Sequence, residues 1–240
     1  MERVHAIVSV AMVEEAAPFL AHCDYKELGV RGGAQFYLLK RENQLPVLLI
    51  QSGIGLACAA GALAYALTQF ETETVISAGT CGGLGRAVEV GDICVSTTIA
   101  YTDVDATAFG YERGQNPGQP ARFESPRALT SAMRVAAEAV RATKGEELAK
   151  QQIHTGQMLA GNSFVTAHNV KDTREAFPEA ISTDMETVAL AQLCHAYGLS
   201  FVSVRSASDL CGPEAGQDFH MDSGLAAARS ADVVCAWAEI

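Results

Sequence analysis

Basic residues are scarce in this 240-residue sequence, which has 17 lysines and arginines against 28 aspartates and glutamates. The formal net charge is −11. Proteins that bind the phosphate backbone of a nucleic acid need a basic face. We therefore expect that this protein does not bind nucleic acid. A neutral or cationic small molecule remains a suitable ligand.

Motifs for metal or disulfide binding are absent as well. The seven cysteines contain no C-x-x-C pair, and the six histidines contain no H-E-x-x-H motif. Cysteines such as Cys94 and Cys194 lie inside apolar runs, which is typical of reduced, buried thiols and not of a disulfide framework or a zinc site. We therefore expect no metal and no cofactor.

Long hydrophobic runs are also missing. No stretch is long enough to span a bilayer. The N-terminal run MERVHAIVSVAMVEE lacks a basic lead-in, and the acids after it do not resemble a cleavage site. We interpret this run as a first strand, and we expect a cytoplasmic protein with no membrane partner.

What the sequence does contain is an alternation of short and long apolar segments. Short runs that end in small residues predict strands buried on both faces, at 4–10, 47–53, 74–79, 92–98, about 153–159 and 200–209. Alanine-rich or periodic segments predict helices at 55–70, at 124–143 with Ser125 as the N-cap, from about Ala167, from Met185, and at the C-terminus. The pattern has no linker and predicts an α/β fold: one domain over 1–240, with a central mixed, mostly parallel sheet flanked by helices.

One long segment, residues 99–124, departs from this alternation. It contains Pro117, Pro120 and four aromatic residues, and it shows no convincing helical period. A loop of this length inside a compact domain is usually functional or covers a neighbour.

Acidic residues stand beside several predicted strand ends. Ligands in open α/β sheets bind beyond the carboxyl ends of the strands, so we expect these acids to meet at one cleft beside the glycine turn GTCGG (79–83). Each acid also has a simpler interpretation, because acids favour helix starts and aspartates cap turns. The glycine turn matches neither the dinucleotide motif nor the P-loop. The acids concerned are Glu14, Glu15, Asp184, Glu186 and Asp209.

Together, these acids suit the cleavage of an N-glycosidic bond. That reaction needs an acid that protonates the departing heterocycle and a base that activates water. It also needs an anchor for the ribose hydroxyls, which a carboxylate provides through strong charge-assisted hydrogen bonds. Several acids and few cations in one cleft favour a sugar that becomes cationic in the transition state.

The chain resembles the 5′-methylthioadenosine/S-adenosylhomocysteine nucleosidases of the nucleoside phosphorylase superfamily. The resemblance covers nearly the whole chain in order and with similar spacings. The matching stretches are AMVEE (11–15), SGIG (52–55), SAGTCGGL (77–84), VGDICVS (90–96), TAFGYERGQNPGQPARF (107–123), GNSFV (161–165), TDMETVALAQLCHAYGLSFVSVRSASD (183–209) and DF (218–219).

The resemblance implies catalytic roles for two residues. Glu15 matches the acid that serves as the base for the attacking water. Asp209 matches the acid that delivers a proton toward N7 of adenine, and Ser208 lies beside it.

The resemblance also implies contacts to the substrate. Glu186 matches the carboxylate that binds the ribose 2′- and 3′-hydroxyls, and Met185 matches the residue beneath the sugar. Arg205 is expected to orient the acids. Further binding residues implied by the matching stretches are Met12, Ile54, Gly82, Phe164, Val165 and Phe219.

The long loop acquires a role through the same resemblance. Phe109, Tyr111 and Pro117 match positions that cross to the neighbouring subunit and line the pocket for the 5′-substituent. The resemblance therefore implies that the protein is a homodimer and that its substrate is a nucleoside.

The chain departs from the usual family pattern at several positions. Asp184 stands where members usually carry glutamate, Val13 where another acid is frequent, and Cys81 where alanine is common. The segment 211–220 also differs, which bears on the match of Phe219 and on substrate preference.

Three other functions compete with hydrolysis of methylthioadenosine and S-adenosylhomocysteine. A phosphorylase would use phosphate in place of water, but a carboxylate at Glu15 would repel that anion, and Arg86 is the only arginine close to the glycine turn. A nucleosidase that prefers futalosine-type substrates or 5′-deoxyadenosine would differ in its 5′ pocket. A non-catalytic nucleoside-binding protein would need neither Glu15 nor Asp209.

Overall fold

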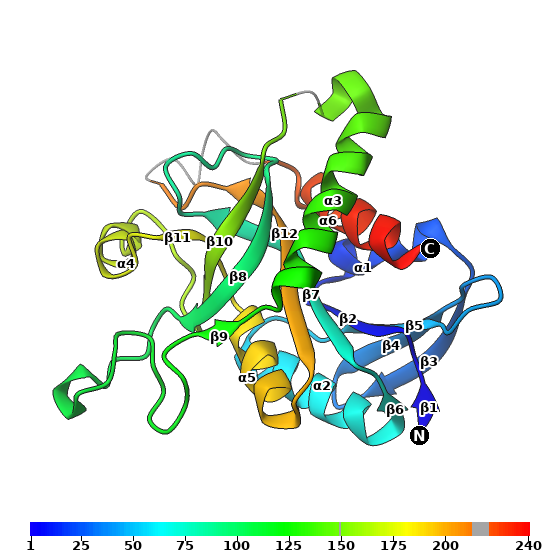
Figure 1. The fold of residues 1–240 in the computed structure, drawn as a ribbon, viewed down its shortest axis with the longest axis horizontal. Helices are drawn as coiled ribbons and strands as arrows, with labels where there is room; N and C mark the ends of the chain where they lie inside the picture. The colour runs from blue at the N-terminus through cyan, green and yellow to red at the C-terminus, as the bar shows by residue number, and fades with distance from the viewer. Residues whose placement is uncertain (149, 213–220) are drawn as a thin grey trace.

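The computed structural model describes residues 1–148, 150–212 and 221–240, and its centre is one large mixed sheet (Figure 1). The strand order in this sheet is β11-β10-β8-β12-β7-β2-β5-β4-β3, with β9 paired to β8. A separate small sheet pairs β1 with β6. The strands are β1 Glu2–Arg3, β2 Ala6–Val10, β3 Tyr25–Arg31, β4 Ala34–Leu39, β5 Val47–Gln51, β6 Phe70–Glu71, β7 Thr74–Gly83, β8 Ile93–Tyr101, β9 Phe123–Glu124, β10 Ile153–Ala160, β11 Ala180–Asp184 and β12 Ser200–Asp209.

Helices cover both faces of the sheet. Helices α1, α3 and α6 pack together on one face, and α2 packs with α5 on the other (Figure 1). The helices are α1 Val13–His22, α2 Leu56–Gln69, α3 Arg127–Lys144, α4 Val170–Ala176, α5 Thr187–Tyr197 and α6 Ser223–Ala238, with short 3₁₀ helices η1 Thr107–Phe109 and η2 Gly145–Leu148.

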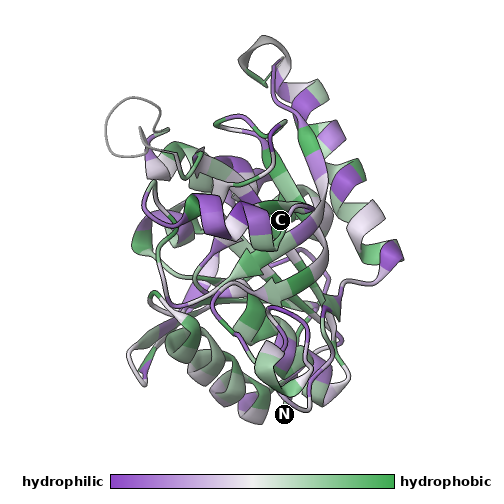
Figure 2. Cartoon of the chain, turned by 90° about the vertical axis from the view of Figure 1, so that its left-hand side faces the viewer, coloured by the Kyte–Doolittle hydropathy of each residue, from purple (hydrophilic) through white to green (hydrophobic). Residues whose placement is uncertain are grey.

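Strand β2 illustrates why the short apolar runs form central strands. Its alternate residues Ala6, Val8 and Val10 pack in the core under α1, α3 and α6, whereas Ile7 packs in the core under α2 and α5. Because successive side chains point to opposite faces, a strand covered on both sides must be apolar throughout. Strands β2 and β5 are accordingly mostly apolar, and hydrophobic residues predominate in the interior of the molecule (Figure 2).

Part of the sheet closes on itself, and this closure forms the site. Strand β11 pairs parallel with β10 and antiparallel with β7, where Thr183 lies opposite Gly82. Strands β7, β12, β8, β10 and β11 therefore form a continuous ring. The carboxyl ends of β7, β11 and β12 meet as a result.

Most elements expected from the sequence are present, with shifts at their ends. Helix α5 begins at Thr187 and not at Met185, because Asp184 accepts hydrogen bonds from the backbone N–H groups that open the helix. The prediction of Ser125 as the N-cap of α3 is wrong. Pro126 occupies that position, and the Ser125 hydroxyl instead bonds Ser96 Oγ at 2.7 Å.

Some strands were not expected. The hairpin of β3 and β4 forms the sheet edge, where β3 is largely exposed and its sequence shows little apolar alternation. Strand β8 extends to Tyr101 and takes the first residues of the segment predicted as a loop. The rest of that segment, up to β9, contains only η1, and Figure 1 shows it extending away from the body of the molecule.

Two expectations from composition can be compared with the structure. Five of the seven cysteines are buried, as predicted, whereas Cys23 is half-buried and Cys58 is exposed. Within the described ranges, none of the helices combines the length and apolarity that crossing a membrane requires.

Candidate active site

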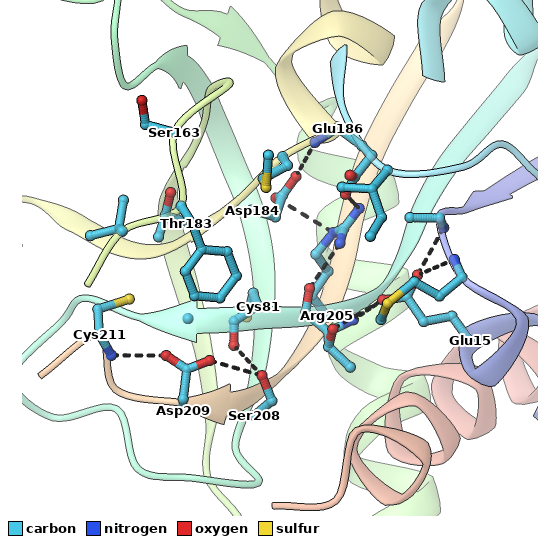
Figure 3. Close-up of a pocket in the computed structure, with 18 residues that line it drawn as sticks. Glu15, Cys81, Ser163, Thr183, Asp184, Glu186, Arg205, Ser208, Asp209 and Cys211 are labelled. Carbon is cyan, nitrogen blue, oxygen red and sulfur yellow. Dashed lines mark hydrogen bonds and ion pairs between the residues drawn. The ribbon is translucent and has the colours of Figure 1, made fainter. Parts of the chain in front are cut away.

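A cavity opens where the carboxyl ends of β7, β11 and β12 meet the start of α1 (Figure 3). Figure 3 shows Asp209 at one end, Glu15 at the other, and Glu186 with Arg205 between them. The structure thus brings together acids that are up to 194 positions apart in the sequence, 209 − 15. The predicted site residues that line the cavity are Met12, Glu15, Ile54, Gly82, Phe164, Val165, Met185, Glu186, Arg205, Ser208 and Asp209.

Glu15 is held by four hydrogen bonds at the start of α1. Its Oε2 accepts from the backbone N–H groups of Ala11 at 2.8 Å and Met12 at 3.2 Å. Its Oε1 accepts from the Thr80 backbone N–H at 2.7 Å and from Thr80 Oγ1 at 3.0 Å. These four donors fix both oxygens of the buried carboxylate at the wall of the cavity.

Glycine at position 79 leaves the space that Glu15 occupies. A Cβ atom there would lie 2.3 Å from Glu15 Oε1, and the backbone φ is +128°. Both facts favour glycine, because other residues avoid this region of φ. The prediction of a glycine turn at 79–83 is wrong, because these residues form the end of β7, where Gly79 leaves room for an acid from α1.

Asp209 ends β12 and is also nearly buried. Its Oδ1 accepts from the Cys211 backbone N–H at 2.9 Å, and its Oδ2 accepts from Ser208 Oγ at 3.0 Å. The Ser208 hydroxyl also lies 3.3 Å from the Cys81 carbonyl oxygen. Ser208 can therefore donate either to Asp209 or to the backbone, depending on whether Asp209 carries a proton.

Glu186 is held between the turn before α2 and strand β12. Its Oε1 accepts from the Gly55 backbone N–H at 2.9 Å, and its Oε2 lies 3.3 Å from an Arg205 guanidinium nitrogen. Arg205 is 1% exposed and also donates to Ser77 Oγ and the Thr80 carbonyl, each at 2.8 Å. Arg205 on β12 therefore connects β7 to the start of α5.

The charge in this cavity is strongly unbalanced. Burial raises the pKa of Glu186 to about 7, the nearby charges of Asp184 and Glu15 add to this effect, and Arg205 and the Gly55 N–H oppose it. The pKa of Arg205 is raised because Asp184, Glu186 and Glu15 surround it, which outweighs its own burial. Arg205 is the one basic side chain that lines the cavity within the part of the chain that the structure describes.

Three residues predicted from the sequence lie elsewhere in this chain. Phe109, Tyr111 and Pro117 belong to the long segment between β8 and β9 and do not line this cavity. The Phe109 side chain is 84% exposed. Phe219 lies outside the described residues.

Other lining residues were not singled out from the sequence. Thr80 supplies two of the hydrogen bonds to Glu15, and its position directly after Gly79 in the GTCGG stretch was the available signal. Cys211 has a φ of +54°, and burial raises the pKa of its thiol to about 12 with a further contribution from Asp209. Ser163 and Thr183 also line the cavity. Both lie in stretches that match the family, GNSFV and the segment from Thr183, and that match was the available signal.

In the described ranges, no group of three or more histidine, cysteine or acidic side chains is arranged to hold a metal ion. Each acid in the cavity instead accepts at least one hydrogen bond from a backbone N–H group, a hydroxyl or Arg205. The site therefore holds the buried carboxylates of Glu15, Asp184, Glu186 and Asp209 around one space.

Fold and site together define the class of protein. The model of the phosphorylase superfamily matches residues 5–239, and the chain belongs to this superfamily. A relative from Geobacillus sp. (strain WCH70), a 5′-methylthioadenosine/S-adenosylhomocysteine nucleosidase, is 35% identical over 93% of each chain. Within the superfamily, the chain belongs to the 5′-methylthioadenosine/S-adenosylhomocysteine nucleosidase family.

Solved structures of relatives agree with this assignment. The nucleosidase of this name from Neisseria meningitidis, in complex with methylthio-immucillin-A, has a TM-score of 0.88 and 33% identity, and the match covers 100% of this chain and 99% of that one. The nucleosidase from Colwellia psychrerythraea 34H, in complex with adenine, has a TM-score of 0.82 and 33% identity, covering 99% and 94%.

Proposed function

We propose that this protein hydrolyses the N-glycosidic bond of 5′-methylthioadenosine and S-adenosylhomocysteine, and of 5′-deoxyadenosine, releasing adenine and the 5-substituted ribose. The observation that carries the proposal is one cavity that holds Glu15, Glu186 and Asp209 with Arg205 as its basic lining residue. Acids at both ends of the space supply the base and the acid of the reaction. Excess negative charge favours the cationic sugar of the transition state.

Glu15 is the proposed base. Its four hydrogen bonds fix its oxygens at the cavity wall. A water molecule beside it would lose a proton to Glu15 as its oxygen attacks the anomeric carbon. The same negative charge would repel phosphate, which favours hydrolysis over phosphorolysis.

Asp209 is the proposed acid. Its proton would pass to N7 of adenine as the glycosidic bond breaks, so that the base leaves as a neutral molecule. Ser208 supports both states of Asp209, because its hydroxyl has the carboxylate and the Cys81 carbonyl within reach. The reaction therefore alternates between two arrangements of the same hydroxyl.

Glu186 is the proposed ribose anchor. An ionised carboxylate can accept from both the 2′- and 3′-hydroxyl groups, while Met185 lies beneath the sugar. Around the purine, Gly82 and Val165 would contribute backbone contacts and Phe164 a ring face. Phe164 is 65% exposed, so its ring is free to cover a bound base.

The active form would be a homodimer in the cytoplasm. An apolar groove runs between α2 and α5, and the exposed Phe109 stands on the segment that extends from the body. A second copy covering the groove would receive Phe109, Tyr111 and Pro117 at its own cavity, where they would line the pocket for the 5′-substituent. The residues of the groove are Leu56, Ala57, Ala60, Tyr101, Ala189, Gln192, Leu193 and Ala196.

The decisive experiment incubates the protein with methylthioadenosine, S-adenosylhomocysteine, 5′-deoxyadenosine, a futalosine-type nucleoside and inosine, with and without phosphate. Chromatography then separates free ribose products from ribose phosphates. We expect adenine and free 5-substituted ribose without any need for phosphate. Phosphate-dependent release of adenine would establish a phosphorylase instead.

Variants assign the roles. Asp209→Asn and Glu15→Gln should each lower kcat by about 10²–10⁴, while Asp209→Asn still binds the nucleoside in calorimetry. Glu14→Gln is the matched control, because Glu14 is an exposed acid next to Glu15. A near-normal rate for Asp209→Asn would remove Asp209 from the acid role.

A further inference from the structure

Asp184 lines the cavity two residues before Glu186, yet both of its oxygens face the protein's own groups. Its Oδ1 accepts from the backbone N–H groups of Glu186 at 2.8 Å and Thr187 at 2.7 Å. These N–H groups belong to the first residues of α5 and have no acceptor within the helix. Asp184 therefore fixes the main chain from which the Glu186 side chain starts.

The second oxygen of Asp184 faces Arg205. Asp184 Oδ2 lies 3.4 Å from Arg205 Nε, and the two side chains are each 2% exposed. Neither atom forms a hydrogen bond with any residue that the structure describes. Glu186 lies 3.3 Å from another nitrogen of the same guanidinium. One buried cation is thus shared by two carboxylates.

The presence of Asp184 and Glu186 beside the same Arg205 guanidinium affects the charge of Glu186. The charged groups that face Glu186 are Asp184 from β11, Arg205 from β12 and Glu15 from α1, and the Gly55 N–H faces it from the turn before α2. The negative charge of Asp184 raises the pKa of Glu186, and Arg205 lowers it. Cys81 on β7 stays a neutral thiol, because its neighbour Cys94 and its burial raise its pKa well above the ordinary value.

We propose that Asp184 is a positioning residue that acts through Glu186: its Oδ1 holds the Glu186 main chain, and its Oδ2 shares the Arg205 guanidinium with the Glu186 carboxylate. The inference rests on the proposed function, in which Glu186 binds the ribose. Asp184 itself would not touch the substrate, because Oδ1 is occupied by two N–H groups and Oδ2 by the arginine.

Two substitutions separate the two effects. Asp184→Asn keeps a carbonyl oxygen for the two backbone N–H groups but removes the charge. Asp184→Ala removes both. Asp92→Asn is the matched control, because Asp92 is 2% exposed and accepts from the backbone N–H groups of Glu89 and Gln152, away from the cavity.

The measurement is kcat/KM for methylthioadenosine between pH 5.5 and pH 8.5. Without the Asp184 charge, Arg205 pairs more fully with Glu186, and the pKa of Glu186 falls. In Asp184→Asn we expect the ratio of kcat/KM at pH 6 to that at pH 8 to rise about threefold over the unsubstituted protein. In Asp92→Asn this ratio should not change, even if the variant is less stable.

A second measurement separates positioning from general damage. In Asp184→Ala we expect kcat/KM at pH 8 to fall at least about tenfold, while the dissociation constant for adenine, which has no ribose, stays the same. An unchanged pH ratio in Asp184→Asn, or an equal loss of adenine affinity in Asp184→Ala, would overturn the proposal. If Asp184→Ala does not fold, Asp184→Asn alone decides through its pH profile.

A failure of the proposed function can be distinguished from a failure of the Asp184 proposal. If the unsubstituted protein releases no adenine from any nucleoside tested, hydrolysis is wrong. Calorimetric binding of methylthioadenosine across the same pH range then tests Asp184 in place of kcat/KM. Loss of binding below pH 7 in the unsubstituted protein, shifted to lower pH in Asp184→Asn, would still support the positioning role.

Discussion

Glu186 shows how a single buried carboxylate couples stability to function. Burial raises its pKa to about 7, and a single guanidinium, which Asp184 also occupies, opposes that rise. The free protein therefore holds a charge that water would solvate better. A ribose that donates two hydrogen bonds to Glu186 would replace the lost water. Binding of the substrate would therefore offset the free-energy cost of the buried charge.

This arrangement predicts a pH dependence of stability. A group with a raised folded-state pKa contributes stability that is complete below its ordinary pKa of about 4.5 and is lost as the pH rises through about 7. The free energy of unfolding should therefore fall between pH 5 and pH 8. In Glu186→Gln that fall should be smaller by up to about 3 kcal/mol, because each pKa unit corresponds to about 1.4 kcal/mol. Urea denaturation at several pH values measures it.

Glu14→Gln is the control for this measurement, because Glu14 is an exposed glutamate and the substitution removes the same charge from the surface. It should keep the pH dependence of the unsubstituted protein. A Glu186→Gln variant whose unfolding free energy depends on pH as before would show that Glu186 is ionised at no cost in the free protein.

At the scale of elements, the start of α1 and the end of β7 fit together at one contact. Glu15 sits in the first turn of α1, and its carboxylate fills the space beside Gly79 on β7. Thr80, the next residue of β7, supplies two of the hydrogen bonds to that carboxylate. The position of the proposed base is therefore decided by two elements and not by the helix alone.

Gly79→Ala tests this contact. The new Cβ would lie 2.3 Å from Glu15 Oε1, so the carboxylate must move, and kcat/KM for methylthioadenosine should fall by about 10² or more. Gly33→Ala is the matched control: it has a φ of +87° in the β3–β4 turn and nothing within 4 Å of the new Cβ. Equal kcat/KM in the two variants would contradict the role of the contact.

At the scale of the whole molecule, the long segment between β8 and β9 places none of its predicted pocket residues in the cavity of its own chain. Phe109 is 84% exposed there and lies outside the cavity of its own chain. An exposed aromatic residue on a projecting segment and an apolar groove between α2 and α5 are typical of surfaces that a second copy covers. The proposed homodimer would give both a role.

Mixed dimers test whether Phe109 acts across the interface. Subunits that carry Phe109→Ala are combined with subunits that carry Asp209→Asn, and the mixed dimer is isolated through two different affinity tags. If Phe109 lines the partner's pocket, one site contains both changes and the other contains neither. We expect that second site to retain the full kcat/KM for methylthioadenosine.

If Phe109 instead served its own chain, both sites of the mixed dimer would be impaired. Light scattering on the purified protein supplies the accompanying measurement of mass. A monomer that is fully active would exclude the contribution of Phe109 in this form altogether.

The sequence predicted local structure well where the pattern alone determined it. Helix α2 and strand β12 match the predicted segments, because an alanine-rich run and a run buried on both faces each have one stable conformation. The hairpin β3–β4 was missed, since its exposed edge strand shows little apolar pattern. Strand β11 was missed because five residues before a helix start carry little signal of their own.

By itself, the sequence determined the α/β fold, the character of its thiols, and the acids Glu15, Glu186 and Asp209 as residues of one site. Only the tertiary structure decided which groups Asp184 contacts. The pairing of β11 with β7 and the burial of Arg205 bring its carboxylate against a guanidinium 21 positions along the chain, 205 − 184. Sharing a buried cation depends on distances of a few ångströms, and no local pattern of residues encodes them.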